Sequence, residues 1–177
     1  ASLENTSEHP LAEAIVSNAK EKSVKLSEVS DFQAIPGHGV RGLIDKTTYF
    51  LGNRKLITDK TKGRLESFEA SLQKLESEGK TAMLLATDND VIGVVAVADT
   101  VKPSSKTDIE RLKGLGISVY MLTGDNKRTA TAIAGQLGVD NIIAEVLPED
   151  KASKVKELQS SGHKVAMVGD GINDAPA

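Results

Sequence analysis

The 177-residue sequence has no cysteine and no tryptophan, and aromatic residues make up only 3% of it. The absence of cysteine excludes disulfides, thiolate metal ligands and cysteine nucleophiles. The scarcity of aromatic rings argues against a stacking platform for single-stranded nucleic acid. The net charge is −3 and the Lys and Arg residues are scattered, so the basic footprint of a nucleic-acid or anionic-membrane binder is absent. We therefore expect no nucleic-acid partner.

Long apolar runs are also missing. None approaches the roughly 20 residues of a transmembrane helix, and the N-terminus lacks the pattern of a signal peptide. The 39% of hydrophobic and 27% of charged residues are ordinary for a soluble globular protein. The chain opens at a helix-like segment and stops at "NDAPA" without a closing element. We expect a soluble fragment of a larger protein.

The first half of the chain has the pattern of an α+β domain. Pro10 and the apolar spacing after it predict a helix over residues 10–21. Short β-like runs broken by glycine over residues 32–57 predict an antiparallel meander. An apolar stripe predicts a helix that ends at Gly79. Two strands are expected at residues 81–87 and 91–99, joined by the turn 88–90.

After Asp99 the pattern changes. Helices expected near residues 103–115, 127–137 and 149–160 alternate with apolar strands at 117–122, 141–146 and 164–168. This alternation is typical of βαβ units and a parallel sheet. The fold class is therefore predicted as α/β plus α+β, with one domain at 1–97 and a second at 98–177.

The strongest chemical pattern is "VGDGINDAPA", which follows the expected strand 164–168. Ligands of open α/β sheets bind outside the carboxyl ends of the strands. Asp170 and Asp174, with Asn173 between them, can converge on one Mg²⁺, which prefers oxygen ligands. The alternative is a Gly-Asp turn followed by a helix cap.

The run "MLTGDN" also follows an apolar strand. The hydroxyl of Thr123 and the loop of Gly124 and Asp125, at the start of a helix, suit an anion. Alternatively, Asp125 or Asn126 only caps that helix. Lys151, near the start of another helix, could neutralise a phosphoryl group or be a solvated helix charge.

The candidate ligand contacts in the first half are Glu4, Glu8, His9, Gly37, Gly39, Gly52 and Asn53. Glycines alternating in a strand-rich stretch weaken the strand unless something must approach its backbone; otherwise they belong to a bulge or turn. A histidine at a helix N-terminus tends to be neutral, and a neutral imidazole can stack on and hydrogen-bond a purine. A lone histidine there can also be incidental.

The motifs "SEHPLA", "GHGVRG", "GNRKLI", "MLTGDN", "LPEDK" and "VGDGINDAPA" occur in one order and spacing. Together they resemble the cytoplasmic ATP-binding region of P-type ATPases, and specifically the heavy-metal (CPx, or P1B) branch. The resemblance spans essentially the whole chain, and the His-Pro motif is its branch-specific part. It implies a nucleotide-binding domain at 1–97 joined to a partial phosphorylation domain, of the haloacid-dehalogenase-like (Rossmann-type) class, at 98–177.

The resemblance also implies roles for the candidate residues. ATP or ADP is bound through Glu4, His9, Gly37, Gly39, Gly52 and Asn53. Thr123, Gly124 and Asp125 match the TGD loop, Lys151 matches a phosphate-contacting lysine, and Asp170, Asn173 and Asp174 match the Mg²⁺ hinge motif. Asp99 and Thr100 match a second hinge. The implied activity is ATP-driven export of a soft metal ion, with copper expected, from the cytoplasmic side of a membrane.

One departure concerns the nucleophile. In the family this is the aspartate of Asp-Lys-Thr-Gly-Thr on a strand before the nucleotide-binding domain, and that segment is absent here. The run "DKTKG" at residues 59–63 has Lys62 in place of glycine, and we interpret it as a surface loop. The family's membrane helices, actuator domain and metal-binding cysteines are absent too. The fragment is therefore expected to bind nucleotide without turnover and without binding the transported ion.

Two other functions remain open. A soluble haloacid-dehalogenase-like phosphatase would need its own Asp-x-Asp nucleophile upstream, and none occurs in this sequence. A non-catalytic nucleotide-binding module would share the nucleotide contacts and also lack turnover. The residues that precede Ala1 would separate these possibilities.

Overall fold

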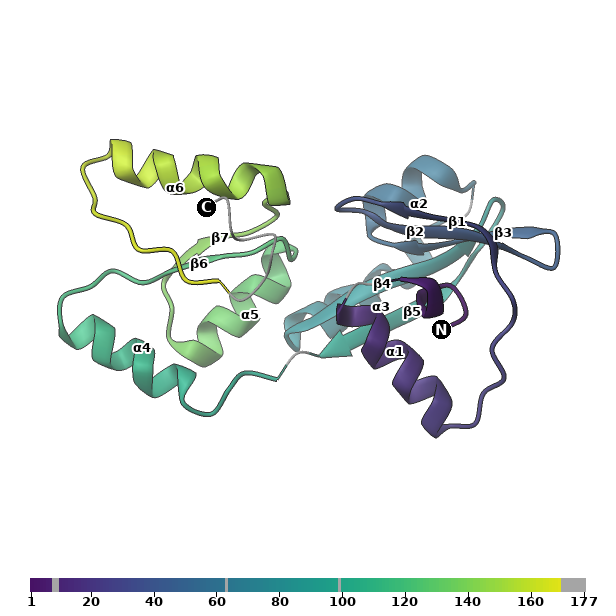
Figure 1. Ribbon diagram of the computed structural model, residues 1–177, viewed down its shortest axis with the longest axis horizontal. Helices are drawn as coiled ribbons and strands as arrows, with labels where there is room; N and C mark the ends of the chain where they lie inside the picture. The colour runs from purple at the N-terminus through teal and green to yellow at the C-terminus, as the bar shows by residue number, and fades with distance from the viewer. Residues whose placement is uncertain (8–9, 63, 99, 170–177) are drawn as a thin grey trace. The chain divides into compact units, whose positions relative to one another are not determined.

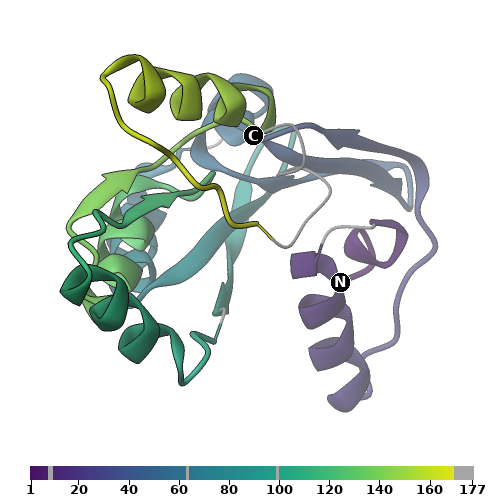
Figure 2. The same cartoon turned by 60° about the vertical axis from the view of Figure 1, so that its left-hand side comes forward.

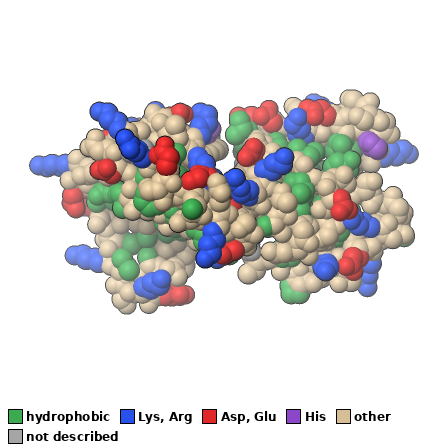
Figure 3. Space-filling view, turned by 180° about the vertical axis from the view of Figure 1, so that it is seen from behind, with side chains coloured by type: hydrophobic (Ala, Val, Ile, Leu, Met, Phe, Trp, Pro, Cys, Tyr) green, Lys and Arg blue, Asp and Glu red, His purple; other side chains and the backbone are tan. Residues whose placement is uncertain are grey.

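The computed structural model describes residues 1–7, 10–62, 64–98 and 100–169 (Figure 1). The chain divides into two compact units, Ala1–Thr100 and Val101–Ala177, and each is described by itself. Within the described ranges, no helix has both the length and the apolar character needed to cross a bilayer. On the face drawn in Figure 3, acidic and basic side chains are interspersed.

The first unit contains a five-stranded antiparallel sheet whose strands follow one another in chain order. They are β1 (Ser30–Ile35), β2 (Gly39–Ile44), β3 (Thr47–Gly52), β4 (Lys80–Thr87) and β5 (Val91–Ala98). Asp45 and Lys46, both with positive φ, form the two-residue turn between β2 and β3, as tight hairpins require. The predicted meander and the two later strands are confirmed.

The helical segments of the first unit cover both faces of this sheet (Figures 1 and 2). They are η1 (Glu4–Thr6), α1 (Pro10–Glu21), α2 (Arg54–Lys60) and α3 (Glu66–Ser77). Side chains alternate across a strand, so Phe50 and Leu51, neighbours in β3, join different clusters. Leu51 packs with Leu3 and Val40, on the side that also receives Ile15 of α1.

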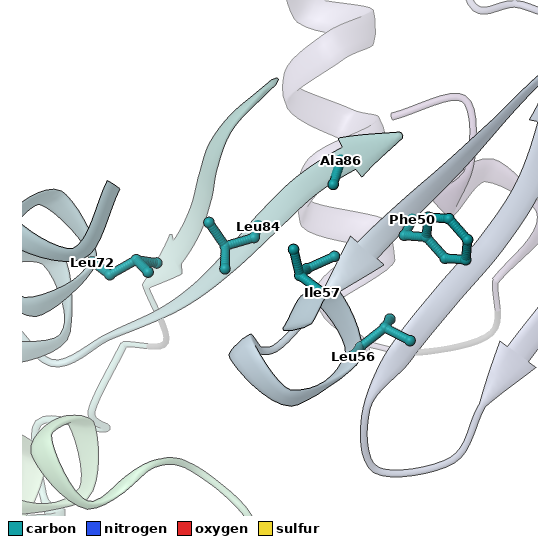
Figure 4. Close-up of a cluster of buried hydrophobic side chains, with 6 residues drawn as sticks. All are labelled: Phe50, Leu56, Ile57, Leu72, Leu84 and Ala86. Carbon is teal, nitrogen blue, oxygen red and sulfur yellow. The ribbon is translucent and has the colours of Figure 1, made fainter. Parts of the chain in front are cut away.

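Phe50 belongs to the second cluster, on the side of α2 and α3. Figure 4 shows this cluster, whose members are Phe50, Leu56, Ile57, Leu72, Leu84 and Ala86. Each is at most 5% exposed, and full burial of a Leu, Ile or Phe side chain contributes about 1.5–3 kcal/mol. The core therefore fixes α2 and α3 against β3 and β4.

Helix α2 corrects the sequence prediction, which gave residues 32–57 a β pattern and residues 59–63 a loop. The meander ends at Gly52, and Asp59 and Lys60 lie in the last turn of α2. The reason is local: the Asn53 side chain accepts a hydrogen bond from the Leu56 amide and starts the helix. The apolar pair Leu56 and Ile57 then faces the core.

The second unit has a two-stranded parallel sheet, β6 (Tyr120–Leu122) and β7 (Asn141–Ile143). Its helical segments are α4 (Ser105–Gly114), α5 (Lys127–Leu137), η2 (Pro148–Asp150) and α6 (Lys151–Ser160). The three predicted helices and the parallel pairing are confirmed, with strands shorter than expected. The ammonium of Lys113 on α4 contacts Asp140 and donates to the Gly138 carbonyl at 2.7 Å, which ties α4 to the end of α5.

The predicted strand at residues 164–168 is wrong. This segment has no regular secondary structure, and Val168 is 92% exposed. A strand needs a neighbour that completes its backbone hydrogen bonds. Among the described residues, β6 and β7 pair only with each other, so the apolar pattern alone did not produce a strand.

Candidate functional site

Gly39 and Gly52 face each other across β2 and β3. A Cβ on Gly39 would lie 2.6 Å from the Gly52 Cα and would collide with the Leu51 carbonyl oxygen. A Cβ on Gly52 would lie 2.7 Å from a methyl of Leu56 and would collide with the His38 carbonyl. These two glycines therefore allow strands β2 and β3 to approach each other closely at this position.

Asn53 ties the turn before β2 to the start of α2. Its Oδ1 accepts from the Leu56 amide at 3.0 Å, and its Nδ2 donates to the Gly37 carbonyl at 3.1 Å. Its backbone amide donates to the His38 carbonyl at 2.9 Å. Gly37 itself has φ 70°, in the left-handed region. Four predicted residues, Gly37, Gly39, Gly52 and Asn53, therefore form one local structure, called here the glycine turn.

Glu4 lies in η1 and is only 6% exposed. Its Oε2 atom is buried and has no hydrogen-bond partner among the described residues. A buried polar atom without a partner is costly, and most such atoms in proteins are satisfied by protein or water. The unpaired oxygen suits a hydrogen-bond donor supplied by a ligand.

Arg54, the first residue of α2, binds two carboxylates of α3. It contacts Glu69 at 2.9 and 3.1 Å and Glu76 at 2.5 and 3.1 Å. Glu76 is fully buried. The hydrogen bond to Glu76 raises the pKa of Arg54, burial lowers it, and the bond to Glu69 raises it further; the net result lies above the usual range. This ion-paired group was not predicted from the sequence.

A signal for this ion pair does exist in the sequence. Glu76 follows Leu72 by four residues, so both lie on the buried stripe of α3. A carboxylate on an apolar stripe requires a cation nearby. The position of the partner, Arg54, could not be obtained without knowing that residues 54–60 form a helix.

In the second unit, Thr123, Gly124 and Asp125 follow β6 directly, as predicted. The Thr123 hydroxyl donates to Asp125 Oδ2 at 2.8 Å and accepts from the Asp125 amide at 3.1 Å. A Cβ at Gly124 would lie 3.3 Å from the Val146 carbonyl oxygen. The TGD loop is therefore closed on itself and packed against the segment after β7.

The cap of α5 is Asn126, whose side chain accepts from the amides of Arg128 and Thr129. Capping thus does not explain Asp125. The segment after β7 holds the loop from the other side, since the Val146 amide donates to the Thr123 carbonyl and the Glu145 amide to the Asp125 carbonyl. Glu145 has φ 60°, an uncommon conformation for a non-glycine residue.

Lys151 is the first residue of α6 and is partly exposed. Several predicted residues lie outside the described ranges: Glu8, His9, Asp99, Asp170, Asn173 and Asp174. Thr100, the other predicted hinge residue, is exposed. Within the described part of the chain, no three His, Asp or Glu side chains come together as a metal site.

Comparison with known proteins places the chain in a family. The family model of the haloacid dehalogenase-like hydrolases matches residues 1–177. Copper-exporting P-type ATPases of Staphylococcus aureus strains JH9 and MW2 are 52% identical to it over all 177 residues. The chain spans 22% of the length of these relatives.

Two solved structures are similar over 99% of the chain. The catalytic domain of the CPx-ATPase CopB-B is 30% identical with a TM-score of 0.70, and 60% of that chain is covered. A zinc-transporting PIB-type ATPase in the E2.Pi state is 36% identical with a TM-score of 0.57, and 28% of it is covered. These likenesses agree with the predicted fold class and with the resemblance, and the chain belongs to the haloacid dehalogenase-like hydrolases.

Proposed function

We propose that this chain is the ATP-binding catalytic region of a copper-exporting P-type ATPase, on the cytoplasmic side of a membrane. Its 52% identity to copper-exporting ATPases over all 177 residues supports the assignment. In this proposal residues 1–97 bind ATP or ADP, and residues 98–177 are part of the phosphorylation domain. The membrane and actuator parts, and the aspartate that accepts the phosphoryl group, belong to the rest of the parent protein.

The observation that carries nucleotide binding is the unpaired oxygen of Glu4. A carboxyl oxygen without a hydrogen-bond partner is satisfied by a donor, so the proposed partner is a donor. Among the groups of ATP, the exocyclic amine of adenine is an uncharged donor that can enter a buried position. Glu4 would then select adenine, and binding would remove the cost of the unpaired atom.

The glycine turn supports the same proposal. Gly37, Gly39, Gly52 and Asn53 form one hydrogen-bonded structure, and in this proposal the nucleotide lies against it. His9 would stack on the purine and Glu8 would lie beside it. Both follow η1, the segment that carries Glu4.

In the second unit the proposal assigns the phosphoryl group to Thr123, Gly124, Asp125 and Lys151, assisted by Asn173. Phosphoryl transfer depends mostly on positioning and on electrostatic stabilisation. The closed TGD loop supplies such positioning, because its two ends are held by backbone hydrogen bonds from Glu145 and Val146. Asp170 and Asp174 would hold Mg²⁺, which offsets the charge of the phosphates.

The role of Glu4 is tested by calorimetry with ATP and inosine triphosphate, which carries a carbonyl where adenine has its amine. We expect the unmodified chain to prefer ATP by about tenfold or more, the usual effect of a hydrogen bond to a charged group. Glu4→Gln should reduce that preference. Glu13→Gln, on α1, is the control and should bind as the unmodified chain does. Equal affinity for the two nucleotides would contradict the role of Glu4.

His9→Gln tests the other base contact in the same assay, and unchanged affinity would remove His9 from the site. Incubation with γ-³²P-ATP tests the acceptor. We expect no acid-stable label on this chain, because the proposed aspartate lies in another part of the parent protein. Incorporated label would mean that this chain carries its own phosphoryl acceptor.

A further inference from the structure

Arg54 connects the start of α2 to the buried part of α3. Its guanidinium makes four hydrogen bonds to Glu69 and Glu76. The Glu76 side chain is 1% exposed, whereas those of Arg54 and Glu69 are 32% and 36% exposed. The Glu76 carboxylate is thus inside the core, whereas the Glu69 carboxylate binds the same guanidinium and is partly exposed to solvent.

The guanidinium has five N–H groups, and these contacts use most of them. Arg54 is therefore not available as a phosphate-binding group of the usual bidentate kind. Any effect of Arg54 on ligand binding must therefore be indirect, through the position of the first turn of α2.

That first turn begins at Asn53, the centre of the glycine turn. The Asn53 side chain joins the Leu56 amide of α2 to the Gly37 carbonyl. A shift of α2 relative to α3 would move Asn53, and with it the contact to Gly37. The close approach of Gly39 and Gly52 depends on the same position, because Gly52 packs against Leu56.

We propose that Arg54 is a positioning residue for nucleotide binding, which presets the glycine turn by locking the start of α2 onto Glu69 and Glu76. This inference rests on the proposed function, since the glycine turn is taken as part of the nucleotide site. A preformed turn loses less conformational freedom when ligand binds, which increases affinity without any contact to the ligand.

A lysine cannot replace Arg54 in this role. Its ammonium is a point charge, whereas the guanidinium is a planar fork that binds two carboxylates at fixed angles. Arg54→Lys therefore keeps the charge beside Glu76 but loses the fixed orientation of α2. This makes it the conservative variant that separates position from charge.

The test combines calorimetry with amide hydrogen exchange on the complete chain. We expect Arg54→Lys to weaken ATP binding about tenfold. In the absence of ATP, it should also speed exchange of the Asn53 and Leu56 amides, which are hydrogen-bonded within the glycine turn and its cap. Exchange of the Leu84 amide in β4 should stay unchanged.

The matched control is Leu72→Ala, a core change on α3 at a residue that takes no part in the ion pairs. It should lower thermal stability at least as much as Arg54→Lys, but bind ATP normally at temperatures where it is folded. Glu69→Gln, which keeps the buried Glu76 paired, is the milder second variant and should shift both readouts in the same direction as Arg54→Lys.

Parental affinity in folded Arg54→Lys would overturn the inference, as would an equal loss in Leu72→Ala. If the unmodified chain binds no ATP, the proposed function fails. The exchange data still decide the positioning role in that case: unchanged rates at Asn53 and Leu56 in Arg54→Lys would reject it, and faster rates there alone would support it.

Discussion

The two units of this chain are stabilised in different ways. In the first unit, a five-stranded sheet is covered on both faces. Most of the buried apolar side chains among the described residues lie in this unit, on the sheet or on the helical segments that cover it. In the second, a pair of three-residue strands supports the loops. Of the nine large hydrophobic side chains that are exposed in the described part of the chain, seven lie in this unit: Val101, Leu112, Leu115, Ile117, Tyr120, Leu147 and Val168. The first unit relies on side-chain packing, the second more on caps and backbone hydrogen bonds.

The largest effect is expected from matched glycine changes in the two units. Gly39→Ala places a Cβ against the backbone of β3 at φ 144° and should destabilise the first unit by about 4 kcal/mol. Gly138→Ala, after α5, meets open space at φ 73° and should cost only about 1 kcal/mol. Chemical denaturation followed by amide signals of each unit measures both. Similar losses would show that the second unit is packed as tightly as the first.

The two asparagine caps give a smaller and sharper test. Asn126→Ala removes the cap of α5 and should cost about 1 kcal/mol. Asn53→Ala removes the cap of α2 together with the bond to Gly37, so about 2 kcal/mol is expected. Asn53→Ala should weaken ATP binding in calorimetry more than Asn126→Ala does, because Asn53 lies within the glycine turn whereas Asn126 only follows the TGD loop. An equal or larger loss in Asn126→Ala would contradict the placement of the nucleotide at the glycine turn.

The smallest effect concerns pH. Hydrogen bonding and charge pairing with Lys80, 2.6 Å away, lower the pKa of Glu78 below its usual 4.5. The pair therefore stabilises the first unit above pH 4.5, and this contribution is lost as the pH falls below that value. Exposed pairs contribute little, so only a slight fall in the urea midpoint is expected.

Glu78→Gln should abolish this fall of the urea midpoint at low pH, when unfolding is followed by the amide signals of the first unit. Glu157→Gln, which removes an exposed ion pair of the second unit, is the control and should leave those signals unchanged. An identical pH profile for Glu78→Gln and the unmodified chain would mean that the pair with Lys80 has no part in acid stability.

The sequence was most informative where local chemistry determines structure. Alternating apolar residues and glycines predicted β1 to β3, and Pro10 and Gly79 predicted where α1 begins and α3 ends. The position of the TGD loop followed from the apolar strand before it. In each case the signal lies within a few residues of the feature.

The sequence was least informative where the outcome depends on distant residues. Residues 164–168 have a strand pattern, but a strand also needs a partner, and apolar periodicity does not name one. Arg54 of α2 pairs with Glu69 and Glu76 of α3, which lie 15 and 22 residues further along the sequence. Helix α2 was missed because Asn53 was interpreted only as a ligand contact and not as a cap.

The chain-order arrangement of the first sheet has a consequence for biogenesis. Each strand from β2 to β5 pairs with the strand made just before it, so every new strand finds its partner already synthesised. Contacts close in sequence favour rapid folding, and domains tend to fold as units while the chain is still being made. We therefore expect this unit to assemble strand by strand as it leaves the ribosome, before the unit that begins at Val101 has folded.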